Sequence, residues 1–417
     1  MIQPADDRYL TVSDVAELLS ISPDTVRRWD KKGLVKSHRN SHNYRVFEKE
    51  SVLELNSKIN GKFNGKSRYK ILKNPVKTNY KVLDLFSGAG GTSLGFKNAG
   101  LKHELLVEID KNAVATLKKN FKNTKIIEAD VSTVDFSQYK GKIDIVEGGF
   151  PCQSFSYAGK KNGFDDVRGT LFFEFARCIK ESQPKIAIGE NVRGLISHED
   201  GKTLKTVISI LNDIGYRVSY KLLKAQYLDV PQKRERLIIV AIRKDLDIPF
   251  LFPKEKNYTI SLREAFKNVP ISAGQSYNEK KKKVLDLVPE GCYWRSLPLK
   301  IQKEYMGGSF YLGGGKTGIA RRMSWDEPSL TLVCSPAQKQ TERCHPSETR
   351  PFTIREYARI QTFPDNWDFQ GSICSQYKQI GNAVPVNMGF HVGRCVIAML
   401  ENKSDLESMV EESEIHL

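Results

Sequence analysis

A chain of 417 residues is long enough for about two to three domains. Its 40% hydrophobic residues agree with a soluble protein, and it has no run of about 18 apolar residues that would span a bilayer. The formal net charge of +16 indicates a polyanionic partner, although a solvated basic surface gives the same balance.

The seven cysteines are scattered along the chain without any Cys-x-x-Cys pair, which argues against a disulfide framework. The first residues show neither the basic start nor the apolar core of a signal peptide. We therefore expect a cytoplasmic protein that does not contact a membrane.

The first 55 residues are expected to form two short helices and a basic hairpin. Apolar residues recur at helical spacing over 12–19, and Ser22 is a suitable N-cap for a second helix. The basic stretch 38–47 resembles the wing of MerR-type or excisionase-type DNA-binding domains. An ordinary two-helix unit is the alternative, but the wing favours a winged helix-turn-helix over residues 1–55. The residues expected to face DNA are Thr25, Arg27 and Arg28.

Residues 56–79 contain many lysines and arginines but no acidic residue. We expect a basic linker, which either follows DNA phosphates or is merely solvated.

From residue 80 onward, apolar strands alternate with helices, which predicts an α/β domain with a mainly parallel sheet over 80–241 and 347–400. Between 242 and 346 the pattern loosens into loops rich in glycine, lysine and aromatic residues, so a second, less regular domain is expected there. The acidic tail 401–417 is expected to fray. The expected strands are 82–86, 105–108, 125–128, 143–146, 186–188 and 237–241.

A glycine-rich loop follows the first expected strand and opens a helix, which is a common position for a nucleotide-type ligand. Asp84 precedes the glycines, where its charge repels a pyrophosphate but attracts the sulfonium or amino group of S-adenosylmethionine. Glu108 is spaced to accept ribose hydroxyls, and Asp130 ends the third strand where an adenine amino group can lie. Structural carboxylates are the alternative, but jointly these residues favour S-adenosylmethionine over NAD.

Cys152 follows Pro151 after an apolar strand and a glycine pair, at the carboxyl end of a strand where reacting groups gather. A buried structural thiol is the alternative, since free cysteine packs as a small hydrophobe. Glu190 also follows a buried strand, while Arg234 and Arg236 lead into another and project to one face. A solvated charge run is less favoured here, so these side chains are expected to meet at one sheet edge.

These runs, in this order, resemble the motifs of the DNA (cytosine-5) methyltransferases over about residues 80–401. The resemblance implies an α/β, Rossmann-like S-adenosylmethionine-dependent methyltransferase domain with a smaller irregular target-recognition domain. It makes Cys152 the nucleophile, Glu190 the acid, and Arg234 and Arg236 the basic pair. The residues implied for the cofactor site are Asp84, Phe86, Ser87, Gly88, Ala89, Gly90, Gly91, Glu108, Ile109, Asp130, Pro151 and Asn382.

The chemistry requires these residue types. C5 of cytosine is too weak a nucleophile to attack a methyl group, and addition of a thiolate at C6 makes an enamine that can. Glu190 would hydrogen-bond N3 and the exocyclic amine, and Arg236 would hold O2 with support from Arg234. Because cytosine in a duplex is inaccessible, it must be flipped out, and the loop 153–170 has the glycines to close over it.

Further residues are expected to contact DNA through bidentate bonds to base edges or through phosphates. They are Gln153, Ser154, Ser156, Arg168, Arg321, Arg322, Gln338, Lys339, Gln340 and Arg343. The spacing of Cys334, Cys344 and His345 fits no usual zinc site, so no metal is expected. The stretch 325–346 resembles the bacterial subgroup that methylates GGNCC or GGWCC sites.

The sequence therefore predicts a methyltransferase that acts as a monomer on double-stranded DNA and protects it from a companion restriction endonuclease. One alternative is a DNA-binding regulator with a vestigial catalytic domain, which the intact Cys152, Glu190 and Arg236 disfavour. The other is an RNA cytosine-5 methyltransferase on the same scaffold, which the large domain over 242–346 disfavours.

Overall fold

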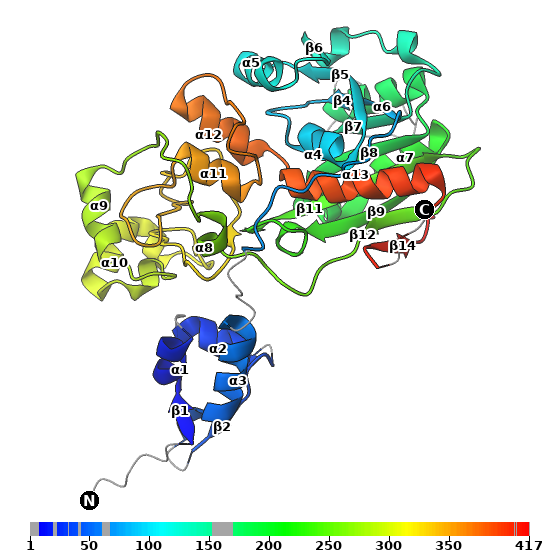
Figure 1. Ribbon diagram of the computed structural model, residues 1–417. Helices are drawn as coiled ribbons and strands as arrows, with labels where there is room; N and C mark the ends of the chain where they lie inside the picture. The colour runs from blue at the N-terminus through cyan, green and yellow to red at the C-terminus, as the bar shows by residue number, and fades with distance from the viewer. Residues whose placement is uncertain are drawn as a thin grey trace, which may run out of the picture.

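A computed structural model describes residues 8–19, 23–31, 33–40, 43–60, 67–151, 170–403, 405 and 407–416. Within these ranges an N-terminal unit precedes a large α/β body, which carries an irregular region on one side (Figure 1).

The N-terminal unit has the predicted helix-turn-helix and wing. Val15, Val26 and Phe47 form its core, and β2 pairs antiparallel with β3 as a hairpin. Strand β1 pairs with the other edge of β3, giving the order β1-β3-β2. Its elements are β1 (Tyr9–Thr11), α1 (Val12–Leu18), α2 (Pro23–Lys31), β2 (Ser37–Arg39), β3 (Arg45–Glu48) and α3 (Lys49–Asn60).

The α/β body is built on a seven-stranded sheet in the order β6-β5-β4-β7-β8-β11-β9, in which β11 runs antiparallel to both of its neighbours. All six predicted strands are present. Strand β9 was not among them, because its apolar residues alternate with Arg217, Lys221 and other polar residues on an edge strand. The strands are β4 (Lys81–Leu85), β5 (Lys102–Glu108), β6 (Lys125–Glu128), β7 (Ile145–Gly148), β8 (Ile186–Val192), β9 (Tyr216–Lys224) and β11 (Glu235–Arg243).

Helices cover both faces of this sheet, because successive strand residues alternate between the two faces. Leu83 and Val146 pack against α6 (Leu171–Ser182) and α7 (Lys202–Asp213) on one face. Val82 and Ile145 pack against α4 (Gly91–Ala99) and α13 (Val386–Glu401) on the other, where Figure 1 shows these two helices lying across the sheet. Helix α5 (Lys111–Asn120) follows β5.

The stretch Ile373–Glu401 is long and apolar enough to cross a membrane by composition alone. Most of its apolar part is buried inside the protein, and α13 contacts α4 along its length. This burial is typical of the core helix of a soluble protein.

The irregular region holds short helices around its own apolar cluster, which includes Leu285, Trp294 and Met306. After this region the chain returns to the α/β body through α11 and α12. Residues of both helices belong to a third apolar cluster, together with residues from the glycine-rich loop after β4 and from α4. The remaining elements are α8 (Leu262–Ala265), α9 (Glu279–Asp286), α10 (Leu299–Met306), β10 (Gln232–Lys233), β13 (Ser329–Leu330), α11 (Ile354–Ile360) and α12 (Ile373–Asn382). Short 3-10 helices occupy Val131–Thr133, Ser137–Tyr139, Arg193–Ile196, His198–Gly201, Ala225–Tyr227, Trp294–Ser296 and Gly307–Tyr311.

The acidic tail is partly ordered as a strand. Residues of β14 (Met409–Glu412) pair antiparallel with β12 (Phe250–Pro253), and Met409 is buried. The expectation that the tail frays is therefore wrong for this segment, because β14 pairs with β12 while Met409, Val410 and Ile415 pack against the core clusters.

Candidate active site

One cavity of about 780 Å³ lies at the carboxyl ends of β4, β5, β7 and β8. It joins the glycine-rich loop after β4 to the strand ends that carry the predicted reacting groups. The predicted residues that line it are Asp84, Phe86, Ser87, Gly88, Ala89, Gly91, Glu108, Ile109, Pro151, Glu190, Arg234, Arg236 and Asn382.

The loop after β4 is fixed by hydrogen bonds to Asp84. This carboxylate is buried and accepts bonds from the hydroxyls of Ser87 at 2.7 Å and Ser93 at 2.5 Å. Phe86 has φ of 60°, a conformation that is strained for a residue with a side chain. The loop therefore has a defined shape, which its hydrogen bonds stabilise against the strain.

Glu108 closes the loop from the neighbouring strand. Its Oε2 accepts the backbone N–H of Gly88 at 2.7 Å, and its Oε1 accepts those of Ile109 and Asp110 at 2.9 and 2.8 Å. Oε2, which accepts one bond, retains acceptor capacity for a hydroxyl of a ligand. A cavity of this size with a fixed carboxylate at its wall fits the adenosyl group of S-adenosylmethionine.

Asp130 and Gly90 are not among the residues that line the cavity. Asp130 is exposed and caps a 3-10 helix, where its Oδ1 accepts the backbone N–H of Ser132 at 2.9 Å. Gly90 is the N-cap of α4 with φ of 83°, so it shapes the turn through its backbone.

The cavity also contains residues that the sequence interpretation missed. Asp110 pairs with Lys378 at 3.0 Å, and both line the cavity together with Thr92 and Glu147. The sequence could have indicated a structural role for Asp110, since an aspartate directly before a helix is a typical N-cap. Glu147 could also have been noticed from the sequence, because it is a charged residue inside an otherwise apolar strand.

On the catalytic side, Arg236 and Glu190 form an ion pair with Nε and Oε1 2.6 Å apart. Both side chains are mostly buried on adjacent antiparallel strands. A Cβ at Gly149 would lie 3.1 Å from Oε2 of Glu190, so the glycine leaves room for this carboxylate. Asn191 donates to the carbonyl of Phe150 at 2.8 Å and so holds the backbone that leads to Pro151.

The predicted nucleophile, Cys152, lies outside the described residues, as do Gln153, Ser154, Ser156 and Arg168. Pro151 is the last described residue before this gap, and it lines the cavity.

Arg234 does not present its guanidinium to solvent. It is buried and donates to the carbonyls of Gly381 at 3.2 Å and of Leu332 and Asn382 at 3.4 Å. Burial lowers the pKa of Arg234 to about 9. Its contacts tie the start of the strand that carries Arg236 to the end of α12.

Two arginines of the irregular region are turned inward. Arg322 is buried and donates to the carbonyls of Val288 at 2.7 Å and Leu285 at 2.8 Å. Arg343 is buried and donates to the carbonyl of Thr331 at 2.8 Å. In this structure neither presents donors to a base, in contrast to the expectation from sequence.

The other predicted DNA-reading residues of this region are more accessible. Gln338, Lys339 and Gln340 are consecutive and exposed. Arg321 is partly exposed, with its guanidinium 5.6 Å from the centre of the Tyr293 ring. Of the residues of this region that the sequence predicts to contact DNA, these four are the ones with exposed or partly exposed side chains.

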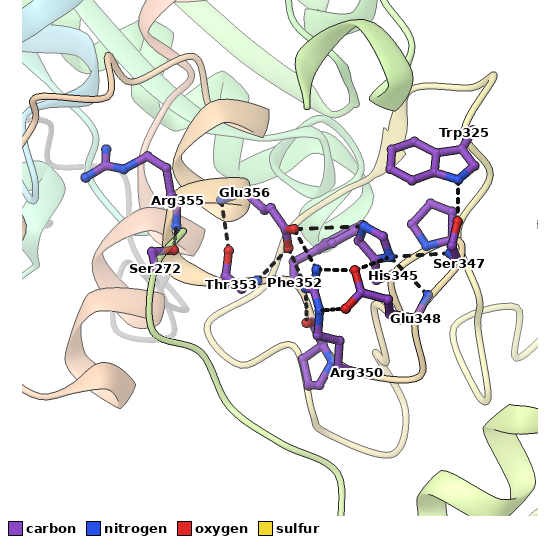
Figure 2. Close-up of polar contacts among 12 residues, drawn as sticks. Ser272, Trp325, His345, Ser347, Glu348, Arg350, Phe352, Thr353, Arg355 and Glu356 are labelled. Atoms are coloured by element: carbon purple, nitrogen blue, oxygen red, sulfur yellow. Dashed lines mark hydrogen bonds and ion pairs between the residues drawn. The ribbon is translucent and has the colours of Figure 1, made fainter. Parts of the chain in front are cut away.

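His345 is a structural residue. Figure 2 shows its ring between the Trp325–Ser347 contact and Glu356, and its Nδ1 accepts the backbone N–H groups of Ser347 and Glu348 at 3.3 and 3.1 Å. A ring nitrogen used in this way is not available to a metal ion. In the described ranges, no group of three or more His, Cys, Asp or Glu side chains could hold a metal.

The second helix of the N-terminal unit contacts the body. The Thr25 hydroxyl donates to Oε1 of Glu327 at 3.2 Å, and Arg28 forms an ion pair with the same carboxylate. Lys233 pairs with the other oxygen at 2.7 Å. Arg27 is exposed and pairs with Asp24 on its own helix.

Comparisons with known proteins agree with this geometry. Residues 80–398 match the model of the family described as C-5 cytosine-specific DNA methylase, and residues 11–47 match that of the MerR family regulatory proteins.

Full-length relatives are also similar. The type II methyltransferase M.Eco47II of Escherichia coli is 54% identical over 94% of this chain and 96% of its own. The type II methyltransferase M.Sau96I of Staphylococcus aureus is 48% identical over 85% of this chain and 84% of its own.

Among solved structures, a putative DNA modification methyltransferase encoded within an Escherichia coli prophage is 25% identical, with a TM-score of 0.57. It matches 78% of this chain and 100% of its own. A Spodoptera frugiperda DNMT2 mutant also has a TM-score of 0.57, at 19% identity over 76% of this chain and 100% of its own, which shows the fold alone.

The matched family model covers most of the chain, and the cavity holds residues from each of the expected motifs. The chain therefore belongs to the C-5 cytosine-specific DNA methylase family and is a DNA (cytosine-5) methyltransferase of the type II class that uses S-adenosylmethionine.

Proposed function

We propose that the enzyme methylates C5 of a cytosine flipped out of a short duplex sequence, through a covalent bond between Cys152 and C6. The observation that carries this proposal is the single cavity in which the Glu190–Arg236 pair faces the glycine-rich loop. Pro151, the residue before the thiol, lines the same cavity. Methyl donor and acceptor can therefore meet beside this thiol.

In the proposed reaction the Cys152 thiolate bonds to C6, and the electrons of the C5–C6 double bond move to make C5 nucleophilic. C5 then takes the methyl group that S-adenosylmethionine supplies, with cleavage of its bond to sulfur. Loss of the C5 proton and cleavage of the C6–sulfur bond restore the ring and the thiolate.

Glu190 and Arg236 act on the base during these steps. Glu190 hydrogen-bonds N3 and the exocyclic amine, which stabilises the ring as the thiolate adds. Arg236 holds O2, and its bond to Glu190 fixes the orientation of that carboxyl group. Arg234 supports Arg236 through the carbonyls it binds.

Transfer of labelled methyl groups to duplex DNA tests this proposal. We expect Cys152→Ala to abolish transfer, whereas Cys374→Ala, which removes an exposed thiol on α12, leaves it unchanged. Undiminished transfer by Cys152→Ala would contradict the covalent route. Competition between duplex DNA and tRNA tests which nucleic acid is the substrate, and we expect the labelled methyl groups to be transferred preferentially to the duplex.

We further propose that the enzyme works as a monomer in the cytoplasm, and that its methylation protects DNA from a companion restriction endonuclease. The type II names of its relatives support this pairing. A GGNCC or GGWCC target rests on the resemblance of residues 325–346. Bisulfite sequencing of DNA from cells that express the enzyme reports both the target and the modified base.

The match of residues 11–47 to MerR regulators favours a second, additional function in which the N-terminal unit binds DNA, for example at its own promoter. Alanine at Thr25, Arg27 and Arg28 together is expected to abolish binding of a promoter fragment while methylation persists. Unchanged promoter binding would refute this function.

A further inference from the structure

Glu147 is an acidic residue in the middle of the sheet. It lies on β7 after the apolar Ile145 and Val146, and its side chain is 3% exposed. In the sheet register it is opposite Asp84 on β4. It also lines the cavity, between the glycine-rich loop and Glu190.

Because Asp84 and Glu147 are opposite each other on adjacent parallel strands, their side chains share one face of the sheet, where both are buried and both line the cavity. A hydrogen bond between two carboxyl groups requires a proton on one of them. Burial raises the pKa of Asp84 to about 6, but the hydroxyl bonds that it accepts from Ser93 and Ser87 oppose this and favour its ionised form. By contrast, burial and the charge of Asp84 raise the pKa of Glu147 well above its usual value. The proton therefore belongs on Glu147.

The surroundings offer no positive charge that would let both groups ionise. Among the described residues, no lysine or arginine forms an ion pair with either carboxyl group. Of the two arginines that line the cavity, Arg236 is paired with Glu190 and Arg234 binds backbone carbonyls. Glu190 on β8 and Glu108 on β5 add negative charge.

The remaining titratable neighbour is His103 on β5, whose Nε2 lies 3.8 Å from Oδ2 of Asp84. Both of its ring nitrogens are buried without a hydrogen-bond partner in the described part of the chain. Burial lowers the pKa of His103 to about 3, so it is neutral and does not compensate the carboxylates.

We infer that Glu147 holds a proton in the folded enzyme and is a positioning residue, whose carboxyl group donates to Asp84 and so fixes the glycine-rich loop for the cofactor. The inference rests on the proposed cofactor site, although the state of the carboxyl pair can be measured without cofactor.

A pH dependence follows. Burial and then the charge of Asp84 raise the pKa of Glu147 well above its usual value. In the unfolded chain this group ionises near pH 4.3. The stability that it contributes is therefore fully present below about pH 4.3 and is lost as the pH rises through the higher pKa of the folded state.

The test compares wild type with Glu147→Gln, which keeps the shape and a hydrogen-bond donor but cannot ionise. Denaturant unfolding of the cofactor-free proteins is measured between about pH 5 and about pH 9. Over that range the unfolding constant of wild type is expected to rise, relative to Glu147→Gln, by up to about tenfold per pH unit. Glu128→Gln, which removes an exposed carboxylate at the end of β6, should follow wild type.

Binding of S-adenosylhomocysteine, measured by calorimetry at neutral pH, gives a second readout without methyl transfer. Glu147→Gln should bind within about threefold of wild type, whereas Glu147→Ala should lose about tenfold, the value of one hydrogen bond. Parallel pH profiles, failure of Glu147→Gln to fold, or a loss of binding equal to that of Glu147→Ala would each overturn the inference. Because these measurements need no DNA, they succeed or fail independently of the Cys152 experiment.

Discussion

Arg236 at the edge of the sheet binds a carboxylate that faces the cavity, whereas Arg322 in the irregular region binds backbone carbonyls. Arg236 places Nε 2.6 Å from Glu190 and lines the cavity. Arg322 is buried, and its bonds to the carbonyls of Leu285, Val288 and His345 join the end of α9 to the distant segment that carries His345.

The difference follows from the backbone around each residue. In the sheet, strand ladders satisfy the carbonyl groups, so the side chain at a strand end is available for a substrate. In the region 242–346, few ladders exist, and buried carbonyls need donors from side chains. An arginine in such a region can therefore bind buried backbone carbonyls and stabilise the fold, and its residue type alone does not show that it binds DNA.

The largest expected effect is that of Arg236→Ala on catalysis. Loss of this donor should lower the rate of methyl transfer about 10²–10³-fold, since it removes a charge aimed at the reacting base. Denaturant unfolding should change little. Arg243→Ala, at the other end of the same strand, is the control and should retain full activity. A rate within about threefold of wild type would remove Arg236 from the catalytic group.

For Arg322→Met the expected effect falls on stability. The change removes the donor of the buried Val288 and His345 carbonyls, and each such group costs about 1–3 kcal/mol. Denaturant unfolding measures the loss, and Arg295→Met provides a control at an exposed position. If Arg322→Met unfolds like wild type but methylates its DNA target poorly, Arg322 reads DNA after all and the comparison fails.

The same contrast explains what the sequence could predict. Short apolar runs between helical segments identified six strands of the sheet. The carboxyl ends of the parallel strands bring the glycine-rich loop and Glu190 to one edge, where the antiparallel β11 begins with Arg236. These predictions succeeded because the sheet imposes its geometry on any residue at a given position.

Other positions depended on contacts between distant segments. Asp130 was expected to end a strand, but β6 ends at Glu128, and the residues after Asp130 turn into a 3-10 helix that uses its carboxylate as a cap. Arg322 and Arg343 have the residue type that reads guanine, yet loops far along the chain supply carbonyls for them. Sequence spacing carries no information on such partners, whereas Glu147 could have been noticed as a charge inside an apolar strand.

The smallest expected effect concerns Glu327, which meets both the N-terminal unit and the body. Its carboxylate binds Arg28 of α2 and Lys233 beside the catalytic arginines. The Arg28 guanidinium is 44% exposed, so water screens the pair and its contribution should be only about 0.2–1 kcal/mol. While Arg28 is bound there, it cannot also bind a phosphate at full strength.

Glu327→Gln should therefore release Arg28 and strengthen binding of the promoter fragment by about fivefold at most, the equivalent of 1 kcal/mol. Titration of the full-length protein with this duplex at low salt measures the change, and the gain should shrink as salt is added. Glu279→Gln, which removes one exposed carboxylate from α9, controls for the change in net charge. Equal gains for the two variants would mean that net charge alone acts, and that Arg28 is as free to meet DNA as the exposed Arg27 on the same helix.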